Sequence, residues 1–229
     1  MTEETSKPSL SPMAEALKGH DADLIGKLAA SGATLRKDEA PAKLMAEGGN
    51  PNDLDQFHFQ SAPRIASTLQ AATKAGIDIN TPVDGEPASH FLTRNYVTRM
   101  VANDYNTSFA AIFGLTDSNH MKYLQAFAEN GVDFLQRDAK GRSFTAVGEE
   151  AAEDYAKAKA PRTMKADYER LYDDDHPPFS HVKEGVAWGL KEVKRAAQAA
   201  SFSALATQKV DDLPVQRKDP KREPTLRSD

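Results

Sequence analysis

The side chains in this sequence best suited to hold a metal ion lie together at Asp173-Asp174-Asp175-His176, directly before two prolines. Carboxylates beside an imidazole are ligands that divalent cations use in proteins. A small metal-dependent enzyme using residues 173–176 is therefore one hypothesis. Adjacent acids point in different directions in any regular structure, so we prefer to interpret the cluster as an exposed acidic loop that ends at the prolines.

The rest of the sequence offers little catalytic chemistry. The histidines lack the i, i+4 pairing that places two metal ligands on one helix face, and no glycine-rich phosphate loop, nucleophile elbow or EF-hand loop occurs. Cysteine is absent, which excludes disulfides, thiolate nucleophiles and cysteine-based metal centres. We expect no enzyme activity, no metal site and no cofactor.

Charge and hydropathy argue against nucleic acid or a membrane as the partner. The 229 residues have a net charge of −5, so the chain lacks the positive field that binds polyanions. No stretch approaches the length that spans a bilayer, and the first residues do not resemble a signal peptide. We expect a cytoplasmic protein, with export by a non-classical signal in the C-terminal tail as the alternative.

An internal repeat gives the clearest information on fold. Residues 24–35, 68–79 and 123–134 align without gaps around three glycines, Gly32, Gly76 and Gly131. The residues seven and four positions before each glycine are apolar and share one helix face. The residues after it alternate as an extended segment does. The pattern predicts a helix that ends at a glycine in the left-handed conformation, followed by an extended segment that projects from the helices, which we call a finger.

A second match follows two of these segments. Residues 80–92 and 136–151 each contain a polar turn with its own glycine, Gly85 or Gly141, before a new helical start. The repeated unit is therefore helix, finger, turn, helix.

This unit resembles the ankyrin repeat, in which a β-turn precedes two antiparallel helices. Gly76-Ile77-Asp78-Ile79-Asn80 matches the family's finger closely, Gly131-Val132-Asp133-Phe134 nearly as well and Gly32-Ala33-Thr34-Leu35 more loosely. Asp84-Gly85 leads to His90 at the position of the family's histidine, which would tie down turn backbone. The glycines are further apart than the about 33 residues of the family, so extra segments fall around residues 36–60 and 93–117.

The resemblance implies a mainly α fold, an irregular ankyrin-like helical solenoid with a C-terminal capping helix and disordered tails. It also implies a scaffold that binds a protein partner, of unknown identity, through exposed finger residues. Tyr96 and Tyr105 are weaker candidates. The finger candidates are Asp78, Asn80, Thr81, Asp84, Asp133, Gln136, Arg137 and Lys140. Local turn chemistry is the alternative explanation for the same Asp and Asn residues.

A long helix is predicted over residues 179–208. Its apolar residues recur at spacings of four and three, Gly185 and Gly189 permit close approach of another helix, and Trp188 is the large anchor. The helix either caps the end of the stack or mediates self-association. The apolar positions are Val182, Val186, Leu190, Val193, Ala197, Ala200 and Ala204.

The predicted organisation has four parts. Residues 1–12 form a disordered N-terminus, 13–160 the degenerate repeats, 161–208 a helical extension and 209–229 a disordered basic tail.

Overall fold

The computed structural model of the protein describes residues 9–48, 62–106, 118–159 and 179–211. These residues form eight helices and no strand, which confirms the predicted mainly α class. The helices are α1 (Pro12–Lys18), α2 (Ala22–Ala30), α3 (Pro41–Glu47), α4 (Ala62–Lys74), α5 (Ala88–Asn106), α7 (Ser118–Glu129), α8 (Phe144–Lys159) and α10 (Phe179–Asp211).

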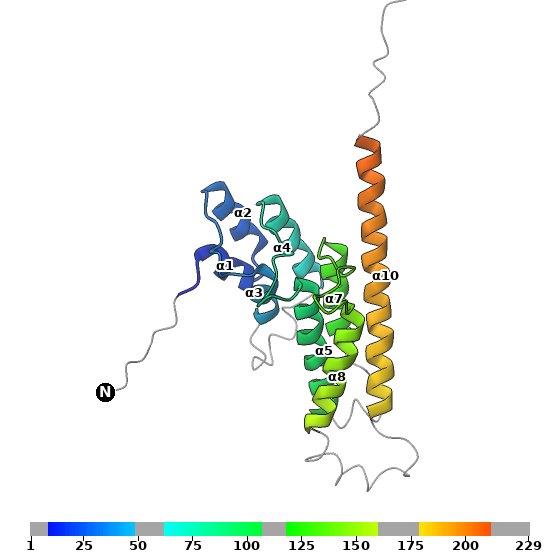
Figure 1. Ribbon diagram of the computed structural model, residues 1–229. Coiled ribbons are helices and arrows are strands. Elements are labelled where there is room, and N and C mark those ends of the chain that lie inside the picture. Colours follow the sequence, from blue (N-terminus) through cyan, green and yellow to red (C-terminus); the bar gives the residue numbers. More distant parts are fainter. Residues whose placement is uncertain (1–8, 49–61, 107–117, 160–178, 212–229) are drawn as a thin grey trace, which may run out of the picture.

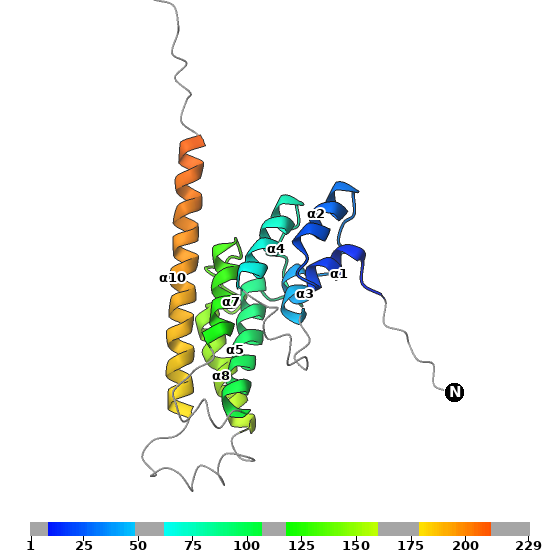
Figure 2. The ribbon, with the colours of Figure 1, turned by 180° about the vertical axis from the view of Figure 1, so that it is seen from behind.

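The helices lie in two rows, side by side (Figures 1 and 2). In one row α1 packs against α3, α3 against α5, and α5 against α8. In the other, α2 packs against α4, α4 against α7, and α7 against α10. Across the rows, α1 contacts α2, α5 contacts α7, and α8 contacts α10. Buried apolar side chains join the rows in one continuous cluster.

The three aligned glycines end α2, α4 and α7 in the predicted left-handed conformation. Gly32, Gly76 and Gly131 have φ angles of 81°, 74° and 99°. Only a residue without Cβ adopts this conformation at little cost, and it turns the chain out of the helix. The next N–H donates to the carbonyl five residues earlier: Ala33 to Leu28 at 2.9 Å, Ile77 to Ala72 at 3.0 Å and Val132 to Phe127 at 3.1 Å.

The segments that follow these glycines are turns rather than strands. The predicted alternation holds around residue 133, because Val132 and Phe134 are buried while Asp133 and Leu135 are exposed. In the described part of the chain, however, the only β pairing is an isolated bridge between Val83 and Glu86. The fingers are therefore held by local side-chain bonds, as shown below, and not by a β ladder.

The two regions assigned to extra segments contribute helices to the rows. α3 lies within residues 36–60, and α5 continues through the start of 93–117 as a helix of 19 residues. Val97, Met100 and Val101 are buried in α5, as their spacing predicts. Residues 49–61 and 107–117 lie outside the described residues.

The N-terminal end of the stack is closed by a buried carboxylate. Ser11 caps α1, so this helix begins at Pro12, within the segment predicted as a disordered N-terminus. Glu39 accepts hydrogen bonds from the Ser11 N–H at 2.8 Å, the Ser11 hydroxyl at 2.6 Å and the Arg36 N–H at 2.9 Å. The Arg36 guanidinium donates to it at 2.7 Å. Burial alone would raise the pKa of Glu39, but these bonds outweigh it and lower the pKa to about 2.

α10 packs along α7 and α8 through the predicted stripe. Val186, Leu190, Val193 and Ala197 are buried, so this part of the stripe has its partner within one chain. Ala204, also predicted to lie in the stripe, is exposed, because α10 extends past the other helices there (Figure 1). A Cβ on Gly189 would come within 2.8 Å of the Met121 sulfur, which confirms that this glycine permits close helix approach. The C-terminal turns of α10 extend past the other helices in both views (Figures 1 and 2).

Trp188 does not anchor the packing of α10 against the other described helices, because its side chain is 62% exposed. The helical period gives the reason: Leu190 points into the core, so position 188, two residues earlier, points to the other side. Of the two roles predicted for this helix, only self-association would use Trp188 as an anchor.

Candidate functional site

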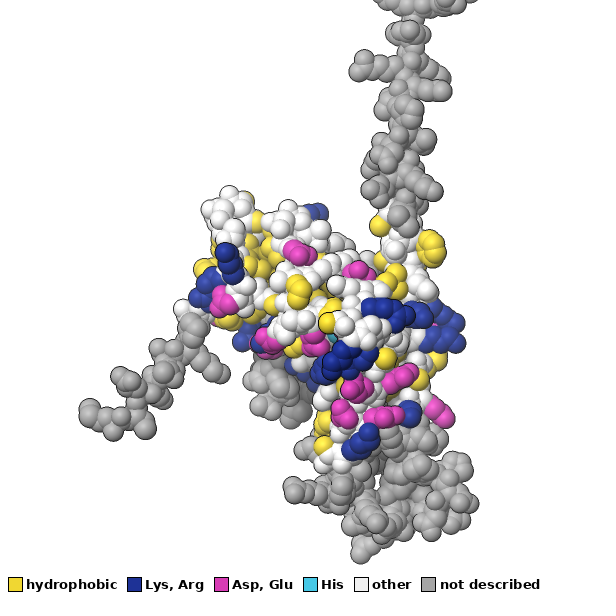
Figure 3. Space-filling model, viewed as in Figure 1, with side chains coloured by type: hydrophobic (Ala, Val, Ile, Leu, Met, Phe, Trp, Pro, Cys, Tyr) yellow, Lys and Arg dark blue, Asp and Glu magenta, His cyan; other side chains and the backbone are white. Residues whose placement is uncertain are grey.

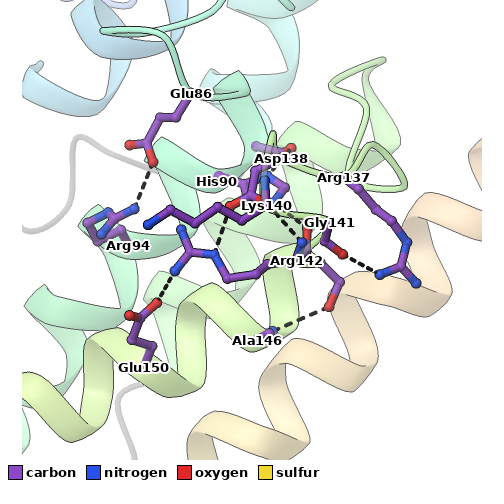
Figure 4. Close-up of polar contacts among 12 residues, drawn as sticks. Glu86, His90, Arg94, Arg137, Asp138, Lys140, Gly141, Arg142, Ala146 and Glu150 are labelled. Atoms are coloured by element: carbon purple, nitrogen blue, oxygen red, sulfur yellow. Dashed lines mark hydrogen bonds and ion pairs between the residues drawn. The ribbon is translucent and has the colours of Figure 1, made fainter.

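The third finger, residues 131–142, ends in a turn organised by Asp138 (Figure 4). Its carboxylate accepts the backbone N–H groups of Lys140 at 2.9 Å and of Arg142 at 2.8 Å. It also accepts the Arg142 Nε–H at 2.8 Å. Desolvation alone would raise the pKa of Asp138, but the hydrogen bonds lower it overall, so the carboxylate stays charged in the turn. Gly141 adopts a φ of 75° to complete the turn.

This turn is fastened to two helices. His90 of α5 is fully buried, and its Nε2 lies 3.1 Å from the carbonyl oxygen of Arg142. The imidazole thus ties down turn backbone, as the sequence predicts. The Arg142 guanidinium also pairs with Glu150 of α8. The backbone of the third finger is consequently held at fixed positions on α5 and α8 (Figure 4).

The second finger, residues 76–86, uses most of its predicted binding residues internally. The Asp78 carboxylate accepts the Asn80 N–H at 3.0 Å, and the Thr81 hydroxyl donates to the Asp78 carbonyl at 2.8 Å. The Asn80 amide reaches the third finger, where Nδ2 donates to the Gly131 carbonyl at 3.0 Å and Oδ1 accepts the Asp133 N–H at 2.8 Å. Asn80 therefore joins the two fingers.

The turn of the second finger is tight. Asp84 and Gly85 both have positive φ angles, of 50° and 83°, and Val83 and Glu86 exchange both backbone hydrogen bonds around them. Positive φ at both central positions is the type I′ geometry, for which Asp-Gly is a preferred pair. The Asp84 side chain is 80% exposed and lies 3.4 Å from Lys43 Nζ. Asp84 therefore presents an exposed carboxylate on the second finger.

The tip of the third finger leaves more side chains available. We define the finger tip as Leu135, Gln136, Arg137 and Lys140, all of which are exposed. Arg137 donates to the Gly141 carbonyl at 2.6 Å and lies on the opposite side of the turn from Arg94 (Figure 4). The side chains of Gln136 and Lys140 have no hydrogen bond or ion pair with another residue that the structure describes. Asp133 differs, because its carboxylate accepts the N–H groups of Leu135 and Gln136.

Four large apolar side chains are exposed in the described residues: Leu24, Leu135, Trp188 and Phe202. Leu135 is 46% exposed in the finger tip, and its place in the alternation after Val132 and Phe134 could have identified it. Trp188 is exposed on α10, as noted above. Conversely, Tyr96 is not a surface candidate, because it is fully buried against Tyr123 and Phe127, and burial raises the pKa of its hydroxyl. The side chain of Tyr105 lies outside the described residues.

Neither metal nor membrane chemistry is evident in the described ranges. No three histidine, aspartate or glutamate side chains there come together to hold a metal ion. The 173–176 cluster lies outside those ranges. Among the helices that are described, none combines the length and apolar character needed to cross a bilayer.

Comparison of the chain with known proteins finds no matching protein family, no matching curated protein and no matching solved structure.

Proposed function

We propose that this chain is an ankyrin-like solenoid that binds a protein partner through the finger tip of its third finger. Three features support the solenoid interpretation. The helices follow one another in two rows, equivalent glycines end α2, α4 and α7, and a buried histidine supports the turn before a new helix. Stacked helix pairs of this kind present extended surfaces, which such proteins use for binding.

The main support for the binding proposal is that the exposed side chains of the finger tip belong to a loop whose backbone is already fixed by hydrogen bonds within the fold. Asp138, Arg142 and His90 fix the turn, and Asn80 fixes its base, before any partner arrives. A partner therefore loses little conformational entropy in ordering this loop, and preorganisation of this kind increases affinity. The polar groups of Asp78 and Asn80 already form hydrogen bonds within the fold, so their contribution is to hold the second and third fingers in position.

The chemistry of the finger tip indicates the kind of partner. Arg137 and Lys140 are cationic, Gln136 offers an amide, and Leu135 offers an apolar side chain. We infer a protein surface that combines carboxylates with a shallow apolar contact, because charged rims set orientation while buried apolar groups supply affinity.

Site-specific photo-crosslinking in the producing cells tests the proposal. A photoreactive residue replaces Gln136 in one variant and Lys27, an exposed residue of α2, in the control. We expect one protein to crosslink at position 136 and not at 27, and Lys140→Glu to reduce that product several-fold. The absence of a specific product at 136, or an equal product at both positions, would refute binding through the finger tip.

A further inference from the structure

The outward face of α10 carries a line of exposed side chains that no other described helix covers. Glu184, Trp188 and Lys191 follow one another at spacings of four and three, so they share one side of the helix. Phe202, which is 72% exposed, continues the line towards the C-terminus. This side lies opposite the buried stripe of Val186, Leu190, Val193 and Ala197.

Charge on this face is divided along the helix. Lys191, Lys194 and Arg195 are exposed beyond Trp188. Before it, Glu184 is exposed, and the exposed Lys183 is paired with Glu153 of α8. Glu192 interrupts the basic half but is paired with Arg195. Lys191, Lys194 and Glu184 form no ion pair with any other residue in the described part of the chain. Considering the described residues alone, two cations without an ion pair thus lie on one side of the tryptophan, and one acid without an ion pair lies on the other.

The neighbouring helix extends the acidic half. A Cβ on Gly148 would lie 2.7 Å from Leu190, and Lys183 Nζ is 3.0 Å from a Glu153 carboxylate oxygen. α8 therefore runs antiparallel to α10, and its exposed acid Glu149, next to Gly148, lies near the level of Leu190 on the Glu184 side. In Figure 3, basic side chains gather at the level of the middle of α10, and acidic side chains gather below them over α8.

We propose that a second copy of this chain docks on this face, with the two α10 helices antiparallel about a two-fold axis beside Trp188. Glu184 and Lys191 are seven residues apart, about 10 Å along a helix, and their midpoint falls next to Trp188. The axis places each Lys191 opposite the second copy's Glu184 and brings the two tryptophans together. A two-fold interface is self-complementary in this way.

The division of charge selects the second copy over other occupants. An acidic peptide or an anionic membrane would neutralise Lys191 and Lys194 but would be repelled by Glu184 and by the neighbouring Glu149. A two-fold copy satisfies both halves at once. An exposed tryptophan at the centre of such a contact is typical of the residues that dominate interface energies. This inference uses a different surface from the finger tip and does not depend on the proposed binding function.

Sedimentation velocity and intrinsic fluorescence of the full chain provide the test. Trp188 is the sole tryptophan of the chain, so its emission reports on this face alone. We expect dimers to form as concentration rises, the emission to shift to the blue as the indole becomes covered, and added salt to weaken both effects. A chain that stays monomeric up to millimolar concentration, or that dimerises without a change in emission, would overturn the proposal.

Charge reversal makes the test specific. Glu184→Lys and Lys191→Glu each place like charges opposite one another, and we expect each to weaken dimerisation about tenfold or more, equivalent to about 1.4 kcal/mol. An equimolar mixture of the two variants restores both contacts in a heterodimer, and the double variant restores them in a homodimer. Lys27→Glu, on distant α2, is the control and should dimerise like the unmodified chain. Failure of the mixture and of the double variant to recover would contradict the arrangement, as would binding to anionic vesicles in place of dimerisation.

Discussion

Replacement of Glu39 by glutamine should remove much of the stability of the N-terminal end at neutral pH and little of it in acid. Two carboxylate oxygens of Glu39 accept five donors from Ser11 and Arg36. Glutamine keeps one acceptor oxygen, but its amide NH₂ must face at least one of these N–H groups. The variant therefore loses charge-assisted bonds and leaves a buried donor unsatisfied.

The magnitude follows from the pKa. Lowering the pKa of Glu39 from 4.5 to about 2 corresponds to about 3 kcal/mol of stabilisation by the ionised form at pH 7. Because the pKa is lower in the folded state, this stability is present above the unfolded value of 4.5 and disappears as the pH falls towards 2. About 2 kcal/mol of it is lost between pH 7 and pH 3.

Urea unfolding of the unmodified chain and of Glu39→Gln, each at pH 7 and at pH 3, measures the difference. We expect a gap of about 3 kcal/mol at pH 7 that narrows as the pH falls through this window. Glu47→Gln is the control, since Glu47 is exposed at the end of α3 and should change stability little. Equal gaps at both pH values, or no gap at pH 7, would show that the ionised carboxylate does not hold Ser11 and Arg36 as described.

Three further substitutions test the packing of the stack by urea unfolding. Asn80→Ala should lower the free energy of unfolding by about 2 kcal/mol, because it removes two hydrogen bonds between the second and third fingers. It should also speed hydrogen exchange of the Asp133 amide, and unchanged exchange would contradict this link between the fingers. Gly189→Ala should lower the free energy of unfolding by about 1 to 3 kcal/mol, because the new methyl group overlaps Met121. The loss should be smaller in a Met121→Ala background, and equal losses in both backgrounds would exclude this overlap as the cause. Gly131→Ala should cost about 1 to 2 kcal/mol because of its left-handed backbone. Gly26→Ala, in an open position inside α2, should instead stabilise by about 0.5 to 1 kcal/mol, and the same sign for both alanines would refute the conformational argument.

The residues predicted to bind a partner differ in whether their hydrogen bonds are to residues close in the sequence or far away. The turn alternative for Asp78 depends on local geometry and is found in the structure. The role of His90 follows from its place in the repeat pattern, because its partner, the Arg142 carbonyl, lies 52 residues away. Asn80 has the same local signature as Asp78, yet its amide bonds to a finger more than fifty residues away. Only the stacking of α4 on α7 decides which of these side chains is used inside the fold and which is left for a partner.

The long C-terminal helix α10 also has features that the sequence shows and features that depend on its neighbours. Its helical period and its glycines are evident from the sequence, and the buried stripe of Val186, Leu190 and Val193 matches the prediction. The same period places Trp188 on the side opposite Leu190, so the sequence already separates it from the buried stripe. Whether another element covers that side depends on the tertiary structure.

The sequence by itself determined where helices end and which of their faces are apolar, because left-handed glycines and side-chain period depend on residues close together in the chain. The tertiary structure alone decided how the fingers are fastened to one another, how Glu39 is buried and which face of α10 stays open. These features depend on contacts between residues far apart in the sequence, and the residue types near each position do not show which distant residues it will contact.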